Sequence, residues 1–241
     1  GVADIVLLKD SFAALPHAFA EGQRIRNGMY NVIKLFLTRV AYLGLLLMTV
    51  PMAGGFPFEP KQKSLLTMIT SSIIIVALAA WAKPGQETRQ SFARQLLHFV
   101  VPVAITQSLV SFFIFLGVYS LNLEQTSTHF AHALVLAQSA LTTYAIFSGL
   151  LLVPFVVPPS AFWVGGNDLS GDWRPTLLAL GLLIIFLVLL ALPPVSAFFS
   201  LVPLSLTSYL FIAVVTLIWG LVQRWFWRIN LLERFLQLDA W

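Results

Sequence analysis

Long apolar stretches separated by short polar segments dominate this 241-residue chain. Each stretch reaches about 20 residues, the length that an α-helix needs to cross the bilayer's hydrocarbon core. The stretches are continuous and do not alternate between apolar and polar residues, unlike the strands of a membrane β-barrel. The pattern predicts six transmembrane helices, at about 29–50, 62–82, 96–120, 130–157, 174–193 and 203–223.

The segments at the two ends of the chain predict different structures. Residues 5–8 form a short apolar run between polar residues, which is typical of a buried strand. Ser11 is a candidate N-cap for a helix that, with no proline after Pro16, could continue into the first span. Residues 224–241 mix aromatic and charged residues, as in an amphipathic helix at the membrane interface.

Composition supports an all-α polytopic membrane protein with the lipid bilayer as its partner. The chain is 59% hydrophobic and 10% charged, whereas soluble domains carry about 25% charged residues. It has no cysteine, which excludes disulfides, thiolate metal sites and a cysteine nucleophile. The net charge of +4 does not indicate nucleic-acid binding, because the basic residues gather at the ends of the spans.

The distribution of Lys and Arg predicts the orientation of the spans. Most of these residues fall on one side of the predicted bundle, and only Lys61 and Lys63 fall on the other. The first group is Arg24, Arg26, Lys34, Lys83, Arg89, Arg94, Arg174, Arg224, Arg228 and Arg234. Cytoplasmic loops carry the basic excess, so we expect a multi-pass protein of the plasma (inner) membrane with both termini in the cytoplasm.

Residues near the N-terminus also carry a family resemblance. They are Ala3-Asp4-Ile5-Val6-Leu7-Leu8, Asp10, Phe12, Glu21-Gly22 and Asn27, followed by Phe56-Pro57-Phe58, Pro60, Ala77-Leu78 and Pro84. This pattern resembles P-type ATPases, at the junction between the phosphorylation domain and the membrane and through the hairpin that follows. The later spans fit the family's C-terminal half in number and orientation.

The resemblance implies a division of the chain and an activity. Residues 1–28 would be the last strand and helix of a truncated cytoplasmic α/β domain of the haloacid-dehalogenase type, with Glu21, Gly22 and Asn27 in the coupling stalk. Residues 29–223 would be the six-helix membrane domain, and 224–241 a cytoplasmic tail. The family transports cations by hydrolysing ATP through an aspartyl-phosphate. Its D-K-T-G and G-D-G-x-N-D motifs are absent here, so the resemblance places the catalytic aspartate, ATP and Mg²⁺ in upstream domains.

The resemblance also implies a transport region on the first two spans. The family's ion-ligand positions on the second span fall on Thr67, Thr70 and Ser71, with Ser72 beside them, and Ser71 replaces the usual aspartate. On the first span, the family's Asn and Glu positions fall near Val40 and Leu43. The familiar carboxylates are therefore missing, and hydroxyl groups alone are weak ligands for a divalent cation. The identity of a metal, if any, stays open.

Arg39 is the remaining candidate, because an ionisable residue inside a span is a functional hypothesis by default. It could bind an anionic group or act as a built-in countercharge, or it could snorkel to the interface. The missing acids and Arg39 leave open a P-type pump for lipid or polyamine-like cargo. A non-enzymatic six-span channel or scaffold is a further alternative.

Overall fold

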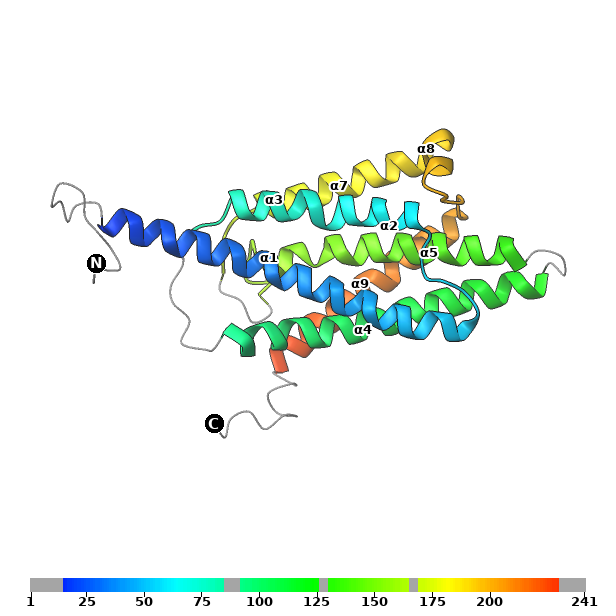
Figure 1. Ribbon diagram of the computed structural model, residues 1–241, viewed down its shortest axis with the longest axis horizontal. Coiled ribbons are helices and arrows are strands. Elements are labelled where there is room, and N and C mark those ends of the chain that lie inside the picture. Colours follow the sequence, from blue (N-terminus) through cyan, green and yellow to red (C-terminus); the bar gives the residue numbers. More distant parts are fainter. Residues whose placement is uncertain (1–14, 85–91, 126–129, 165–168, 230–241) are drawn as a thin grey trace, which may run out of the picture.

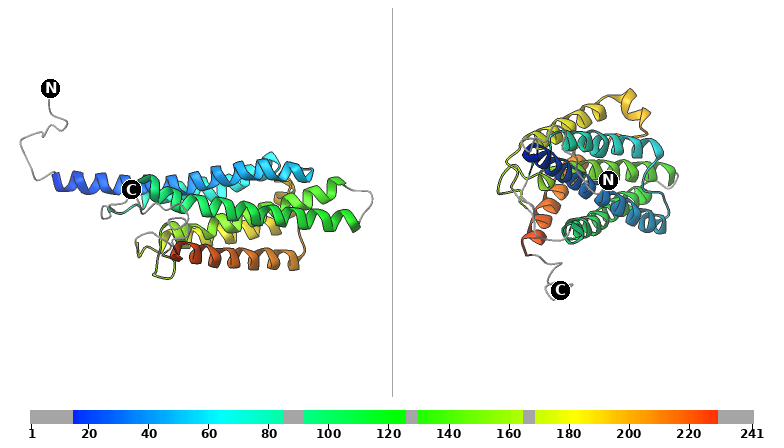
Figure 2. Two further views of the ribbon diagram at one scale, coloured as in Figure 1. Left: turned by 90° about the horizontal axis from the view of Figure 1, so that it is seen from below. Right: turned by 60° about the vertical axis from the view of Figure 1, so that its left-hand side comes forward.

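The computed structural model describes residues 15–84, 92–125, 130–164 and 169–229, and this part is an elongated helical bundle (Figure 1). The helices run along the long axis, and the N-terminal end of α1 projects beyond the others (Figure 2). The predicted strand at 5–8 and the predicted cap Ser11 lie outside the described residues.

Six helical segments are long and apolar enough to cross a membrane, which confirms the predicted fold class. They are α1 (Leu15–Thr49) with η3 (Val50–Ala53); α2 (Pro60–Thr67) with η4 (Met68–Ser72) and α3 (Ile73–Ala80); α4 (Phe92–Gln125); α5 (Phe130–Leu151) with α6 (Val153–Val156); α7 (Arg174–Ala191); and α9 (Leu206–Ile229). The short helix α8 (Pro193–Phe198) precedes α9.

Three helices, α1, α4 and α9, extend beyond the predicted spans. The first, α1, is one uninterrupted helix of 35 residues that includes the end of the predicted stalk. The last, α9, continues to Ile229, so the boundary expected at residue 223 lies inside a helix. Trp227 explains this continuation, because its buried ring stacks on Phe99 at 4.9 Å and contacts Phe155 at 5.1 Å between centroids.

The core lies around α5, which is more fully buried than any other membrane-length helix described. It contacts α4, α7, α9, α2 and η4, while α1 packs against α3 and α4. Large apolar side chains cover much of the outer surface, as expected for helices that face lipid or other membrane helices. This arrangement brings the middle of α1 beside η4, where the predicted transport residues lie.

Candidate functional site

Arg39 and three of the four predicted hydroxyl residues form one contact network between α1 and the junction of α2 with η4. The guanidinium donates from Nη1 to Thr70 Oγ1 at 3.1 Å and to Ser71 Oγ, and from Nη2 to Thr67 Oγ1 at 2.7 Å. We call Arg39, Thr67, Thr70 and Ser71 the Arg39–hydroxyl cluster. Ser72 stands apart, exposed, with its Oγ 3.4 Å from its own helix's carbonyl at Thr67.

The geometry of the second span explains why these hydroxyl oxygens accept from Arg39. Thr67 donates its hydroxyl hydrogen to Lys63 O at 2.7 Å, and Thr70 donates to Leu66 O at 2.6 Å. With those hydrogens committed to the helix, the oxygen lone pairs are left for an external donor.

The hydroxyl cluster coincides with a π-helical turn, η4, in which Ile73 N–H bonds to Met68 O, five residues back. Such turns are rare and often occur at functional sites. Sequence reasoning did not anticipate this turn. The run of Ser and Thr from Thr70 to Ser72 offers the only local signal, because hydroxyl side chains compete for helix carbonyls.

A cavity of about 30 Å³ lies beside the cluster, which is room for about two water molecules. Its lining residues come from four helical segments: Leu35, Thr38, Arg39, Tyr42, Leu66, Thr70, Ser71, Gln107, Ala145, Gly149 and Leu152. Gly149 permits the close approach of η4, since a Cβ there would lie 3.1 Å from Thr70 Cγ2. The cavity therefore depends on a glycine of the central helix.

Three further polar residues complete the cavity wall and were missed as site residues. Tyr42 pairs with Ser111 at 3.0 Å between hydroxyl oxygens, and Gln107 Nε2 donates to Ser148 Oγ at 2.8 Å. Thr38 Oγ1 donates to Lys34 O at 2.7 Å. Tyr42 could have been found by its place beside Arg39, since residues three apart share a helix face.

The charge around the cluster is positive. None of the chain's ten acidic residues lies within the six predicted spans. Lys34, only 1% exposed, lies on α1 with its Nζ 4.1 Å from the centre of the Tyr30 ring. Among the described residues, no group of three His, Cys, Asp or Glu side chains could hold a metal ion. Bare Ca²⁺ takes about 6–8 oxygen ligands, so the cluster alone is not a divalent-cation site.

The predicted stalk residues differ in their contacts. Asn27 Nδ2 donates to Lys83 O at 3.1 Å, which ties α1 to the end of the second span. Glu21 forms an exposed ion pair with Arg24 at 3.4 Å, and Gly22 has open space around it. Next to Asn27, Gly28 approaches the second span so closely that a Cβ would lie 2.9 Å from Ala82 Cβ.

The same end of the bundle is tied to α7 by an ion pair. Lys83 Nζ lies 3.1 Å from Asp172 Oδ2, and Arg174 N–H donates to Asp172 Oδ1 at 3.1 Å. Burial raises the pKa of the Asp172 carboxyl, but the Arg174 hydrogen bond and Lys83 outweigh it, so this pKa lies below its ordinary value. Asn27, Lys83 and Asp172 thus connect α1, the second span and α7.

Comparisons with known proteins identify relatives that carry a transport name. No family model matches the chain. Proteins named calcium-transporting ATPase CtpE from Mycobacterium bovis and Mycobacterium tuberculosis are each 29% identical over 162 aligned residues, covering 61% of this chain and 20% of the relative. The protein of that name from Mycolicibacterium smegmatis is 28% identical over 160 residues, covering 60% and 20%.

The chain thus spans about a fifth of the length of the curated relatives that it matches. These similarities confirm the resemblance to P-type ATPases. They agree with the six membrane-length helices of the structure.

Proposed function

We propose that this chain is the C-terminal membrane part of a P-type ATPase that transports a cation. The similarity to calcium-transporting ATPases, along 61% of the chain, carries this proposal. ATP hydrolysis would proceed through an aspartyl-phosphate, with ATP and Mg²⁺ bound by domains of the same protein outside the present sequence. The chain itself would provide the stalk and half of the transport domain.

In this proposal, residues 1–28 are the end of the phosphorylation domain and α1 is the lever that it moves. A helix of 35 residues spans roughly 50 Å, enough to connect the cytoplasm with the middle of the membrane. Glu21 and Gly22 belong to the N-terminal turns of α1, the end of the helix that projects beyond the others (Figure 2), where cytoplasmic domains could contact it. Asn27 and Gly28 mark where the lever meets the second span.

The Arg39–hydroxyl cluster is the proposed transport region. Its three hydroxyl oxygens are occupied by the guanidinium, so a transported cation could use them only after displacing Arg39. We therefore expect most ligands of the cation to come from helices outside this chain. Ser72, which does not contact Arg39 and faces outward, is the weakest of the predicted ligands.

The test is the cation dependence of the full-length protein, purified and reconstituted in proteoliposomes. We expect Ca²⁺ or another metal ion to stimulate ATP hydrolysis, formation of an acid-stable phosphoenzyme, and ion uptake that requires ATP. A full-length protein that hydrolyses ATP while no metal ion changes the rate and no ion accumulates would contradict cation transport.

The second cargo class is lipid or polyamine-like molecules, and one observation favours its lipid member. The six spans contain no acidic residue and the basic Arg39 lines the cavity, so the site would attract an anionic headgroup and repel a polyamine, which is itself a cation. In the same reconstituted system, stimulation of ATP hydrolysis by phospholipids or spermidine, without stimulation by metal ions, would favour this alternative.

A further inference from the structure

We infer that the bundle face around Arg39 is an interface for another transmembrane helix, one that carries an Asp or Glu side chain opposite the guanidinium. The inference rests on the proposed function only in taking this helix from the same, longer protein. The carboxylate would supply the negative charge that the Arg39–hydroxyl cluster itself lacks.

The first argument is the unbalanced charge. Arg39 lies near the middle of the first predicted span, and every hydrogen bond it makes to a described residue ends on a neutral hydroxyl. Its Nε–H has no acceptor among the described residues, so the Nε edge of the guanidinium can donate a hydrogen bond to a further partner. A charged side chain at the bilayer centre is costly unless it pairs with another group.

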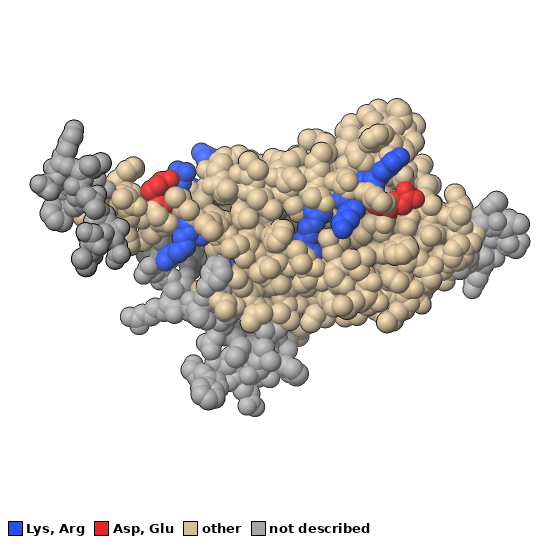
Figure 3. Space-filling view, viewed as in Figure 1, with Lys and Arg blue, Asp and Glu red and all other residues tan. Residues whose placement is uncertain are grey.

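The second argument is the surface around the guanidinium. Val40 beside it is 51% exposed, and Phe36, Met68 and Val76 on the neighbouring turns are also exposed. Figure 3 shows basic side chains in the middle of this face and acidic side chains only toward its ends. An exposed apolar surface with a central positive charge fits an apolar helix with one central carboxylate, because Arg and carboxylate pair through two parallel hydrogen bonds.

The third argument favours a helix over a free anion as the main occupant. The enclosed space beside Arg39 is about 30 Å³ and suits water. A carboxylate on a transmembrane helix has already lost most of its water when the helix packs here. An α-helix also forms all its backbone hydrogen bonds within itself, which a segment inside the membrane requires. The relatives, about five times longer than the matched part, have the necessary chain length.

A charge-swap experiment in the full-length protein tests the pairing. We expect Arg39→Glu to reduce the yield of folded, monodisperse protein about tenfold or more, because a second buried carboxylate would face the first. Changing one Asp or Glu of the covering helix to Arg should restore the yield, and the same change at other intramembrane acids should not. The matched control is Lys63→Gln, which removes an exposed basic residue of α2 and should change nothing.

Cross-linking provides the second measurement, for the case in which Arg39→Glu does not fold under any condition. The present sequence has no cysteine, so Val40→Cys introduces one reporter beside Arg39. It should form a disulfide with cysteines placed within one turn of the acidic residue, and not with cysteines half a helix away. Failure of every acid to rescue, together with no cross-link to an acid-bearing helix, overturns the inference.

Both readouts are independent of ATP hydrolysis and transport. A protein that proves to move lipid instead of a cation would leave the ion pair intact. Conversely, the protein could transport Ca²⁺ while the Arg39→Gln variant is as stable as Lys63→Gln and no cross-link forms. That result would retain the proposed function and reject the interface.

Discussion

The hydrogen bonds that hold Arg39 between two helices depend on other hydrogen bonds within the second span. Thr67 and Thr70 each commit a hydroxyl hydrogen to their own helix, so their oxygens can only accept from the guanidinium. The contact therefore depends on the charge of Arg39 and on the spacing of the hydroxyls along the second span. Changing either partner should affect both stability and transport.

Thr70→Val keeps the shape of the side chain and removes the hydroxyl. We expect this change to lower the free energy of unfolding by about 1–2 kcal/mol, because Arg39 loses an acceptor. Cation-stimulated ATP hydrolysis should also change its concentration dependence. Thr49→Val is the matched control, since Thr49 bonds only to carbonyls of its own helix, at Leu45 and Leu46. Equal effects of the two changes on both measurements would contradict a specific role for Thr70.

Asp172→Asn removes the charge of the carboxyl that pairs with Lys83. We expect a loss of about 0.5–1 kcal/mol at neutral pH, a modest effect because the Lys83 side chain is 57% exposed and water screens the pair. The folded-state pKa is lowered from 3.8, so this stability is present above pH 4 and is lost as the pH falls through the folded-state pKa. Thermal unfolding of both proteins between pH 7 and pH 3 should show the difference shrinking on acidification. A difference that grows on acidification would contradict this pairing.

At the scale of elements, α1 is a single uninterrupted helix that contacts the second span at two levels. Toward the N-terminal end of α1, Gly28 lets the two helices approach, and Asn27 bonds to Lys83 O. Near the middle of the predicted first span, Arg39 bonds to hydroxyls of α2 and η4, at Thr67 and Thr70. A displacement of α1 would therefore act on the second span at both contacts.

Gly28→Leu should separate these helices, because even a Cβ at Gly28 would lie 2.9 Å from Ala82 Cβ. We expect ATP hydrolysis by the full-length protein to continue while ATP-driven cation uptake falls about tenfold or more, as expected when positioning is lost far from the chemistry. Gly44→Ala is the control on the same helix, where nothing lies within 4 Å of the new Cβ. Preserved coupling in Gly28→Leu would show that this contact does not transmit movement.

Deletion of Ser72 tests the π-helical turn. A π turn holds one residue more than an α-helical turn, so the deletion should let the second span close as a regular α-helix without rotating α3. We expect a folded protein whose cation transport is lost. Deletion of Val76 from the regular helix α3 is the control, because it rotates the following residues by about 100° and should prevent folding. Full transport after deletion of Ser72 would show that the turn is dispensable.

The sequence predicted the six membrane-length helices better than the irregular turns and close contacts within and between them. Apolar length alone located the six spans, because the bilayer fixes how many residues each needs. The family pattern selected Thr67, Thr70 and Ser71, and Arg39 was selected by its charge. The π turn, the role of Gly149 and the cavity wall at Gln107 could not be predicted, because they depend on how closely α5 and α4 approach η4. The continuation of α9 likewise depends on the contacts of Trp227.

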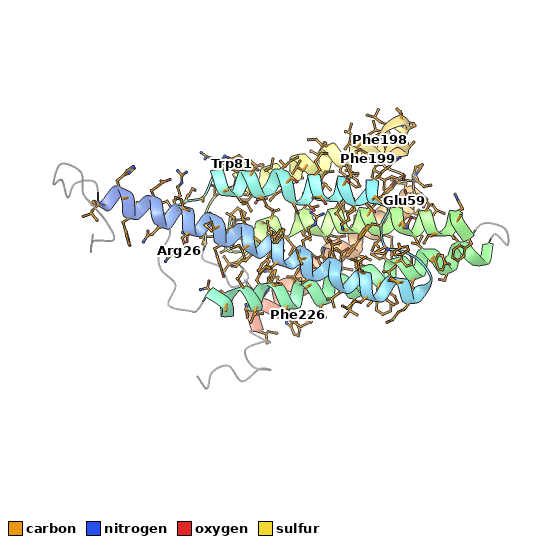
Figure 4. All side chains as sticks on the ribbon, in the orientation of Figure 1. Arg26, Glu59, Trp81, Phe198, Phe199 and Phe226 are labelled. Carbon is orange, nitrogen blue, oxygen red and sulfur yellow. The ribbon has the colours of Figure 1, made fainter. Side chains whose placement is uncertain are left out.

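At the scale of the whole molecule, most charged residues lie toward the two ends of the bundle, and few lie between them. Figure 4 places Arg26 and Trp81 toward one end and Glu59 toward the other. Asn27, Lys83, Asp172 and Arg174 meet at the first of these ends. Because cytoplasmic segments carry the basic excess, this end should face the cytoplasm. The ATP-driven mechanism requires this orientation, since the stalk must connect to domains with access to ATP.

Cysteine accessibility measures the orientation directly, because the present sequence has no cysteine of its own. His17→Cys and Phe56→Cys mark opposite ends, at an exposed stalk position and at a loop residue that is 70% exposed. Neither change alters a Lys or Arg, so the orientation signal is preserved. In intact cells carrying the full-length protein without other cysteines, an impermeant maleimide should label the Phe56→Cys variant, and His17→Cys only after permeabilisation. The reverse pattern would place the stalk outside the cell, away from ATP, and would exclude the proposed coupling whatever the cargo.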